Sequence, residues 1–224
     1  MKPTLALFDL DHTLLPLDSD YSWGKFLVHV GAVQASRFAA DNQRLMDAYN
    51  AGTLNAQDSL PILLAPLAAH SKAQLDAWHT QFMAQIIAPF ITAPAKALLA
   101  KHANRGDTVV IVTATNRFVA APIAQAFGVP DSHLIATEPE FTDGRYTGRW
   151  LGTPSFKEGK VIRVKQWLAQ RGLALSDYET SWFYSDSAND IPLMSVVTHP
   201  VACNPSPALE AHSLAQGWRI QKLW

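Results

Sequence analysis

Four aspartates of this 224-residue chain stand in two pairs, Asp9 with Asp11 and Asp186 with Asp190. Each pair follows a short apolar run of the kind that forms a buried strand. Because the carboxyl ends of parallel strands lie along one edge of a sheet, we expect the four carboxylates to converge. Gathered carboxylates raise each other's pKa values unless a cation lies among them. Oxygen ligands alone indicate Mg²⁺, which binds one or two carboxylates together with water and substrate phosphate oxygens, so the pairs predict a phosphorylated substrate.

Other residues complete the groups needed for phosphoryl transfer. This chemistry depends on positioning and charge neutralisation, so a carboxylate nucleophile, a metal ion and a fixed ammonium group are the parts required. Lys160, at the start of a predicted helix, supplies the ammonium group, with Lys157 as the alternative. Thr113 precedes a helix whose first amides, beginning at Ala114, would donate to phosphate oxygens. Asp11 leaves its strand for the loop and can therefore act as general acid and then as base.

The elements that must position these residues alternate between strand and helix, which predicts an α/β fold with a parallel sheet and right-handed crossovers. Apolar and β-branched runs predict strands over 5–8, 108–112, 134–136, 182–184 and 199–203. Capping residues and apolar periodicity predict helices over 92–106, 116–127 and 157–171, and from Ser206 onward. Residues 140–150 are expected to form a hairpin that turns at Asp143 and Gly144 and serves as a flap.

The stretch 18–89 contains helical patterns and no strand signal, so we expect an all-helical domain inserted into the α/β core. The core is then discontinuous and consists of 1–17 and 90–224. A chain of 24.6 kDa is long enough for one such domain with a large insertion.

Composition excludes several classes of protein. A net charge of -1 and a pI of about 6.7 argue against general binding to nucleic acid or to an anionic membrane. The single cysteine, Cys203, cannot form an internal disulfide, and no Cys/His cluster has zinc spacing. Acidic residues interrupt the N-terminal segment before a signal sequence develops, and polar residues and prolines interrupt the apolar stretch 82–100. We therefore expect a cytoplasmic protein.

The order of these motifs resembles that of the haloacid dehalogenase (HAD) superfamily. The residues that carry the resemblance span the core: Phe8-Asp9-Leu10-Asp11-His12-Thr13-Leu14, Thr113, Lys160, and Ser185-Asp186-Ser187-Ala188-Asn189-Asp190. The resemblance implies a Rossmann-like parallel sheet. The helical insert is similar to the cap of subgroup IB, which contains the phosphoserine phosphatases, and bacterial histidinol phosphatases have a similar appearance.

By this resemblance Asp9 is the nucleophile that forms an aspartyl-phosphate, and Asp11 is the general acid and then the base. Phosphate binding falls to Thr113, Ala114, Lys160 and Asn189. The implied metal set is Asp9, Asp11, Asp186 and Asp190, with Asp186 binding directly and Asp190 in support. The implied cofactor is Mg²⁺.

The motifs give less information about which residues contact the rest of the substrate. Asp18 and Asp20 stand where the chain enters the helical insert, and Asn116 and Arg117 follow the second motif. All four are expected near the substrate, although helix capping explains Asp20 and Asn116 nearly as well.

Two departures from the phosphoserine phosphatase pattern bear on the substrate. Those enzymes have glycines after the second-motif hydroxyl and a Gly-Asp-Gly fourth motif, where this chain has Ala114-Thr115-Asn116 and Ser185-Asp186-Ser187. A phosphoserine carboxylate would also need a cation, such as Arg37 or Arg44, whereas histidinol phosphate has no carboxylate.

The resulting expectation is a Mg²⁺-dependent phosphomonoesterase that acts on a small phosphorylated metabolite. The alternative is a receiver-like module that accepts a phosphoryl group without turnover. Asp11 argues against this alternative because it supplies the acid and base that turnover needs. A third reading, hydrolytic dehalogenation, is disfavoured because neither Asp11 nor a metal has a part in that displacement. The sequence leaves the oligomeric state and the preference for Mg²⁺ over Mn²⁺ or Co²⁺ open.

Overall fold

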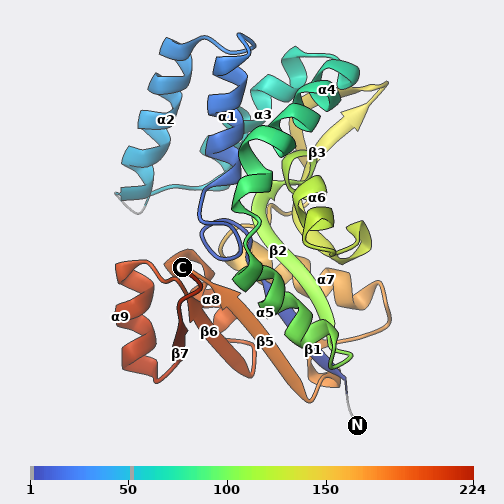
Figure 1. Cartoon of the computed structure of the whole chain (residues 1–224), viewed down its shortest axis with the longest axis vertical. Helices are drawn as coiled ribbons and strands as arrows, with labels where there is room; N and C mark the ends of the chain where they lie inside the picture. The colour runs from blue at the N-terminus through green and yellow to red at the C-terminus, as the bar shows by residue number, and fades with distance from the viewer. Residues whose placement is uncertain (1–2, 51–52) are drawn as a thin grey trace.

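A seven-stranded sheet forms the centre of the protein, in the order β4-β3-β2-β1-β5-β6-β7 (Figure 1). The computed structural model describes residues 3–50 and 53–224, so residues 1–2 and 51–52 of the expected domain ranges lie outside it. All neighbouring strands are parallel except β3 and β4, which pair antiparallel. The strands are β1 (Thr4–Phe8), β2 (Thr108–Asn116), β3 (Leu134–Thr142), β4 (Arg145–Leu151), β5 (Thr180–Ser185), β6 (His199–Cys203) and β7 (Arg219–Gln221).

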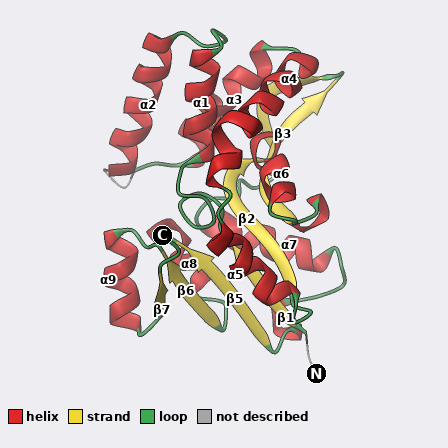
Figure 2. Ribbon diagram, viewed as in Figure 1, coloured by secondary structure: helices red, strands yellow, loops and turns green. Residues whose placement is uncertain are grey.

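Helices α1 to α4 gather at one end of the molecule, whereas the others lie along the sheet (Figure 2). The first group is α1 (Ser19–His29), α2 (Ala35–Asn50), α3 (Ala56–Ala69) and α4 (Lys72–Phe82), and α4 continues into a π-helical turn, Met83–Ile87. The second group is α5 (Ala93–Ala103), α6 (Arg117–Ala126), α7 (Glu158–Ala169), α8 (Ile191–Met194) and α9 (Pro207–Gln216). The expected α/β fold with helices between its strands is confirmed.

Both faces of the sheet are buried. Side chains alternate between the two faces along β1, and each set packs into a different hydrophobic cluster. Ala6 and Phe8 pack into the cluster that includes α5 and α6. Leu5 and Leu7 pack into the opposite cluster, which includes α7, α8 and α9. A strand buried on both sides is held rigidly, so its carboxyl end is a fixed platform for the residues that follow.

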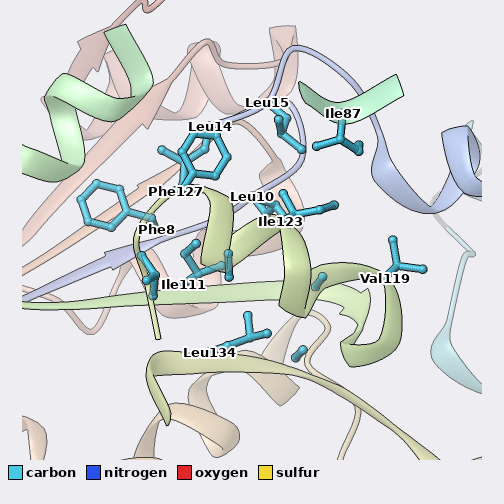
Figure 3. Packing of buried hydrophobic residues seen from close by; sticks show 14 of the residues in the cluster. Phe8, Leu10, Leu14, Leu15, Ile87, Ile111, Val119, Ile123, Phe127 and Leu134 are labelled. Carbon is cyan, nitrogen blue, oxygen red and sulfur yellow. The ribbon is translucent and has the colours of Figure 1, made fainter. Parts of the chain in front are cut away.

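The loop after β1 is anchored by leucines. Leu10, Leu14 and Leu15 are fully buried, and Figure 3 shows Leu10 beside Ile123, Leu14 beside Phe127 and Leu15 toward Ile87. Since these leucines pack into the core, the polar residues between them are held at the end of the sheet.

The expected flap is an extension of the sheet. The strand predicted over 134–136 continues without a break to Thr142, and β4 returns along it. Asp143 and Gly144 form the turn, as predicted, with φ values of 50° and 77°. β4 packs against α3, so the hairpin reaches the helical insert (Figure 1).

In the described part of the chain, no single helix has both the length and the apolar character needed to span a membrane. Lys72–Phe90 and Ala93–Ala103 satisfy this criterion only as a pair bent by 88°.

Candidate active site

A cavity of about 1130 Å³ opens between the carboxyl ends of the strands and the helical insert. Most of the predicted site residues line it, although they come from five separate segments of the chain. They are Asp9, Asp11, Asp18, Asp20, Thr113, Ala114, Lys160, Asp186, Asn189 and Asp190.

The centre of the site is a lysine between two carboxylates. Lys160 Nζ donates to Asp9 Oδ1 and to Asp190 Oδ2, both at 2.7 Å. Ser185 Oγ donates to the same Asp190 oxygen at 2.6 Å. All three charged groups are buried, with exposed fractions of 6% for Asp9, 3% for Lys160 and 2% for Asp190. The ammonium group is therefore fixed beside the Asp9 carboxylate.

Gly159 explains why the first turn of α7, which contains Lys160, can lie so deep in the core. A Cβ on Gly159 would lie 2.0 Å from the Pro154 carbonyl oxygen, so only glycine permits this close approach. Lys157, the alternative lysine, is directed elsewhere: its Nζ donates to the Leu54 carbonyl at 3.0 Å. The lysine that the structure brings to the aspartates is Lys160.

Thr13 links the two acidic motifs. Its hydroxyl lies 3.2 Å from Asp9 Oδ2 and 3.1 Å from Asp186 Oδ1, and it accepts from the Asp186 amide at 3.0 Å. A hydroxyl has one proton, so Thr13 can donate to only one of these carboxylates at a time. The carboxylate that does not receive the Thr13 proton then lies against the lone pairs of the Thr13 oxygen. This arrangement is unfavourable unless a cation or a proton is present.

The pKa shifts of the buried aspartates also indicate an excess of negative charge in the cluster. Burial raises the pKa of Asp186 to about 8, and repulsion from Asp9 and Asp190 adds to the effect. Burial also raises the pKa values of Asp9 and Asp190, although Lys160 opposes this. Burial alone would lower the pKa of Lys160, but Asp190 and Asp9 raise it, so this lysine stays charged. The cluster thus contains one ammonium group, which contacts Asp9 and Asp190, and three carboxyl groups.

The site fits Mg²⁺, but with fewer carboxylate ligands than the four that were predicted. No group of three or more His, Cys, Asp or Glu side chains among residues 3–50 and 53–224 is arranged to hold a metal ion. Asp190 is engaged by Lys160 and Ser185, and Asp11 faces other donors, so the four expected carboxylates do not form one cage. Asp9 and Asp186 approach the same Thr13 hydroxyl, at 3.2 and 3.1 Å, and one or two carboxylates with water are the usual Mg²⁺ ligands, so these two side chains would hold the ion.

A pH-dependent loss of stability is expected from Asp186. In the folded chain without metal it keeps its proton up to about pH 8, whereas in the unfolded chain it loses the proton near its ordinary pKa of about 4. The folded state therefore binds more protons in this window, and stability falls as pH rises through it. Thermal unfolding in EDTA from pH 4 to 9 should show native protein losing stability relative to Asp186→Asn. A constant difference between the two proteins would contradict the raised pKa.

Asp11 is held by two donors at the cavity wall. The Ser19 amide donates to its Oδ1 at 2.8 Å, and Thr115 Oγ1 donates to its Oδ2 at 2.6 Å. Burial, followed by repulsion from Asp18, raises the pKa of Asp11 to about 6. A carboxyl with that pKa can both give and take a proton near neutral pH, which suits a general acid and base.

The predicted phosphate ligands lie around this centre. Thr113 accepts from the Thr115 amide at 3.1 Å, so its hydroxyl proton can be directed at a ligand in the cavity. Thr137 Oγ1 donates to the Ala114 carbonyl at 2.9 Å and fixes the adjoining backbone. The Asn189 amide donates to Ser187 Oγ at 3.2 Å, and its side chain lines the cavity.

Two of the four expected substrate contacts need correction. Arg117 pairs with Glu138 at 2.8 Å and with Asp131 at 2.6 Å, and it does not line the cavity. Asn116 lies behind the cavity wall, where it caps α6 and donates to Asp20 Oδ1 at 2.9 Å. Both side chains are taken up by structural partners, which the sequence could not specify.

Asp18 and Asp20 do line the cavity, where the chain enters α1. Asp18 caps that helix by accepting from the Tyr21 amide at 2.8 Å. Burial raises the pKa of Asp20 well above its usual value, and repulsion from Asp18 and Asp11 adds to this. A cationic group bound at this side of the cavity would offset the repulsion and stabilise the charged form of Asp20.

Four hydroxyl residues of the site were missed by sequence reasoning: Thr13, Ser19, Thr115 and Ser185. Thr13 and Ser185 belong to the quoted motifs, so their position beside strand ends was an available signal. No sequence signal identified the hydroxyls of Ser19 and Thr115, because the Ser19–Thr115 contact joins residues 96 positions apart and the Thr115–Asp11 contact joins residues 104 positions apart.

Comparisons with known proteins agree with this architecture. The family model for haloacid dehalogenase-like hydrolases matches residues 6–195. A histidinol-phosphatase from Neisseria meningitidis is 42% identical over 217 residues, which cover 96% of this chain and 97% of that protein.

Two solved structures extend the comparison. A protein of unknown function from Bordetella pertussis has a TM-score of 0.95 and 53% identity, with full coverage of both chains. A substrate-bound phosphoserine phosphatase has a TM-score of 0.69 and 19% identity, with coverage of 100% of this chain and 94% of that one, and is therefore similar in fold. The family match and the histidinol-phosphatase relative each extend over most of the chain. The chain belongs to the haloacid dehalogenase-like hydrolase family.

Proposed function

We propose that this protein is a Mg²⁺-dependent phosphomonoesterase that hydrolyses a small phosphorylated metabolite through an aspartyl-phosphate on Asp9. The observation that carries the proposal is the buried Asp9 carboxylate, 2.7 Å from the Lys160 ammonium group, with Asp11 two residues further on. A carboxylate nucleophile, a fixed positive charge and an acid that titrates near neutral pH are the parts that stepwise phosphoryl transfer requires.

The residues divide the reaction into two displacements. In the first, an Asp9 carboxylate oxygen bonds to phosphorus while the ester bond breaks, and Asp11 gives its proton to the departing oxygen. In the second, Asp11 takes a proton from water, the water oxygen bonds to phosphorus, and the Asp9–phosphorus bond breaks to release phosphate. Lys160 and Thr113 orient the phosphoryl oxygens. Mg²⁺ on Asp9 and Asp186 would supply further neutralisation of the phosphoryl charge.

Helices α1 to α4 act as a cap in this proposal, over residues 18–89. The cap helices form much of the cavity wall, which would limit the size of the molecules that reach the phosphoryl site. The receiver-like alternative loses support because the chain belongs to a hydrolase family and because Asp11 is present.

For the substrate, we propose a phosphorylated amino alcohol of the histidinol-phosphate type ahead of phosphoserine. Asp18 and Asp20 line the cavity and would attract an ammonium or imidazolium group. A phosphoserine carboxylate has weaker provision: Arg37 lines the cavity but faces Asp41 at 3.7 Å, and Arg44 does not line it. The relative named histidinol-phosphatase supports the same order.

Phosphate release from p-nitrophenyl phosphate, phosphoserine and histidinol phosphate tests this proposal, with Mg²⁺ or EDTA present. We expect release that requires Mg²⁺, with kcat/KM for histidinol phosphate at least about tenfold above that for phosphoserine, the discrimination expected for one unmatched charged group. Release that is unaffected by EDTA would contradict the metal assignment. A preference for phosphoserine would contradict the substrate assignment but leave the mechanism standing.

A further inference from the structure

The carboxyl group of Asp11 is held from two different parts of the fold. Its Oδ1 accepts from the Ser19 amide at the start of α1, and its Oδ2 accepts from the Thr115 hydroxyl near the end of β2. The donor of the first contact is the backbone amide of Ser19, so this contact can persist when the Ser19 side chain is substituted. The second contact, at 2.6 Å, depends on one side chain.

The Thr115 hydroxyl has a defined direction. Thr115 Oγ1 lies 3.3 Å from Ser19 Oγ, and either oxygen could donate in that pair alone. When Asp11 is ionised it can only accept, so the Thr115 proton points to it and Ser19 is then the donor to Thr115. The result is a chain of hydroxyls, Ser19 to Thr115 to Asp11. Both hydroxyl residues are buried, so water does not compete for these bonds.

An irregularity in β2 presents Thr115 to Asp11. The pairing of β2 with β3 shifts register between Val112 and Asn116, and Thr115 lies within this shift. The Thr115 amide donates to Thr113 Oγ1 at 3.1 Å, which fixes the local backbone. The same short segment therefore contains the proposed phosphate ligand Thr113 and the hydroxyl that holds Asp11. Their relative positions are set by one piece of backbone.

We propose that Thr115 is the positioning residue for the acid–base group of this enzyme, with Ser19 as the donor behind it. Asp11 and Thr115 both line the cavity. The Thr115 hydroxyl can therefore fix the orientation of the Asp11 carboxyl group, while each carboxyl oxygen keeps a lone pair that can bind the proton transferred in the reaction. The inference rests on the proposed phosphomonoesterase function. It goes beyond that function by assigning a role to a residue outside the acidic motifs.

The leaving group makes this role measurable. An alkyl phosphate releases an alkoxide, which needs a proton as the ester bond breaks, whereas p-nitrophenolate leaves without one. Since kcat/KM reports on steps up to the formation of the aspartyl-phosphate, it isolates this proton transfer from the later attack of water. Loss of Asp11 positioning should therefore reduce kcat/KM for alkyl phosphates selectively.

The test is Thr115→Val, which removes the hydroxyl and keeps the shape of the side chain. We expect kcat/KM for an alkyl substrate such as histidinol phosphate to fall by about 10 to 100-fold, the range seen when a reacting group is misplaced. For p-nitrophenyl phosphate we expect a change of less than about threefold. Thr115→Ser, which keeps the donor, should restore the alkyl activity to within about threefold of native protein.

Ser19→Ala is a second route to the same result and does not alter Thr115 or the backbone contact. It should lower kcat/KM for the alkyl substrate by about threefold to tenfold and leave p-nitrophenyl phosphate unchanged, because one donor to Thr115 is lost. Ser181→Ala is the matched control: its hydroxyl is also buried, but it accepts from Thr198 toward the other end of β5. It should leave both substrates unaffected.

An equal loss on both substrates in Thr115→Val and Ser19→Ala would overturn the inference, since it would indicate a general structural effect. A failure of Thr115→Ser to restore alkyl activity would overturn it as well. These outcomes differ from failure of the proposed function, in which native protein itself would release no phosphate from either substrate.

Discussion

Asp9→Asn is expected to lower phosphate release by at least about 10³-fold on every substrate, because the amide cannot form the phosphoryl intermediate. The substitution removes one carboxylate from a buried acidic cluster in which burial already raises the pKa of Asp9. Lys160 keeps its other partner, Asp190, at 2.7 Å. We therefore expect the variant to remain folded and to unfold at a temperature no lower than that of native protein. Phosphate release and thermal unfolding, measured on the same preparations, check both parts.

The thermal-unfolding measurement decides how a loss of activity is interpreted. If Asp9→Asn loses activity and also unfolds at a lower temperature than native protein, the loss of activity cannot be assigned to the missing nucleophile. Retention of more than about a tenth of native activity by a folded variant would show that Asp9 is not the nucleophile.

Lys160→Met is expected to affect both stability and activity. The change leaves Asp9 and Asp190 buried without their shared positive charge, and breaking a buried ion pair from one side costs about 3–5 kcal/mol. Without the ammonium group the folded-state pKa values of both carboxyls rise further above their unfolded values. The destabilisation should therefore grow as pH rises above about 4, and denaturant unfolding at pH 5 and pH 8 measures it. Phosphate release at saturating Mg²⁺ should fall by at least about 10²-fold.

Lys157→Met is the matched control for this variant. Lys157 lies three residues earlier, and its Nζ donates to the Leu54 carbonyl rather than to a carboxylate. We expect a loss of about 1 kcal/mol or less and near-native activity. Equal effects of the two lysine substitutions would contradict the assignment of Lys160.

The convergence of Asp9 and Asp186 could be predicted from the sequence, because it depends on topology. Asp9 and Asp186 each follow a buried apolar strand, and the two strands β1 and β5 are parallel neighbours. Their carboxyl ends must then meet at one edge of the sheet. The order of the motifs along the chain therefore fixed which residues converge before any side-chain contact was known.

Contacts that depend on local geometry could not be predicted in this way. Arg117 follows the second motif and was expected near the substrate, but Glu138, from the far part of β3, pairs with it. Glu138 lies between the strand predicted over 134–136 and the hairpin predicted over 140–150, so the sequence did not place its carboxylate beside Arg117. Thr115, which donates to Asp11, lies where β2 shifts its register against β3, and no residue pattern in the sequence marks this shift.

The central claim, an aspartyl-phosphate on Asp9, is tested most directly by trapping the intermediate. Native protein is mixed with radiolabelled p-nitrophenyl phosphate and Mg²⁺, quenched in acid within milliseconds, digested with protease at low pH, and analysed by mass spectrometry. We predict an acid-stable, base-labile phosphoryl group on the peptide that contains Asp9, together with a burst of p-nitrophenolate equal to the amount of enzyme. Asp9→Asn should give neither. A phosphoryl group on any other residue, or one that persists in Asp9→Asn, would contradict the account.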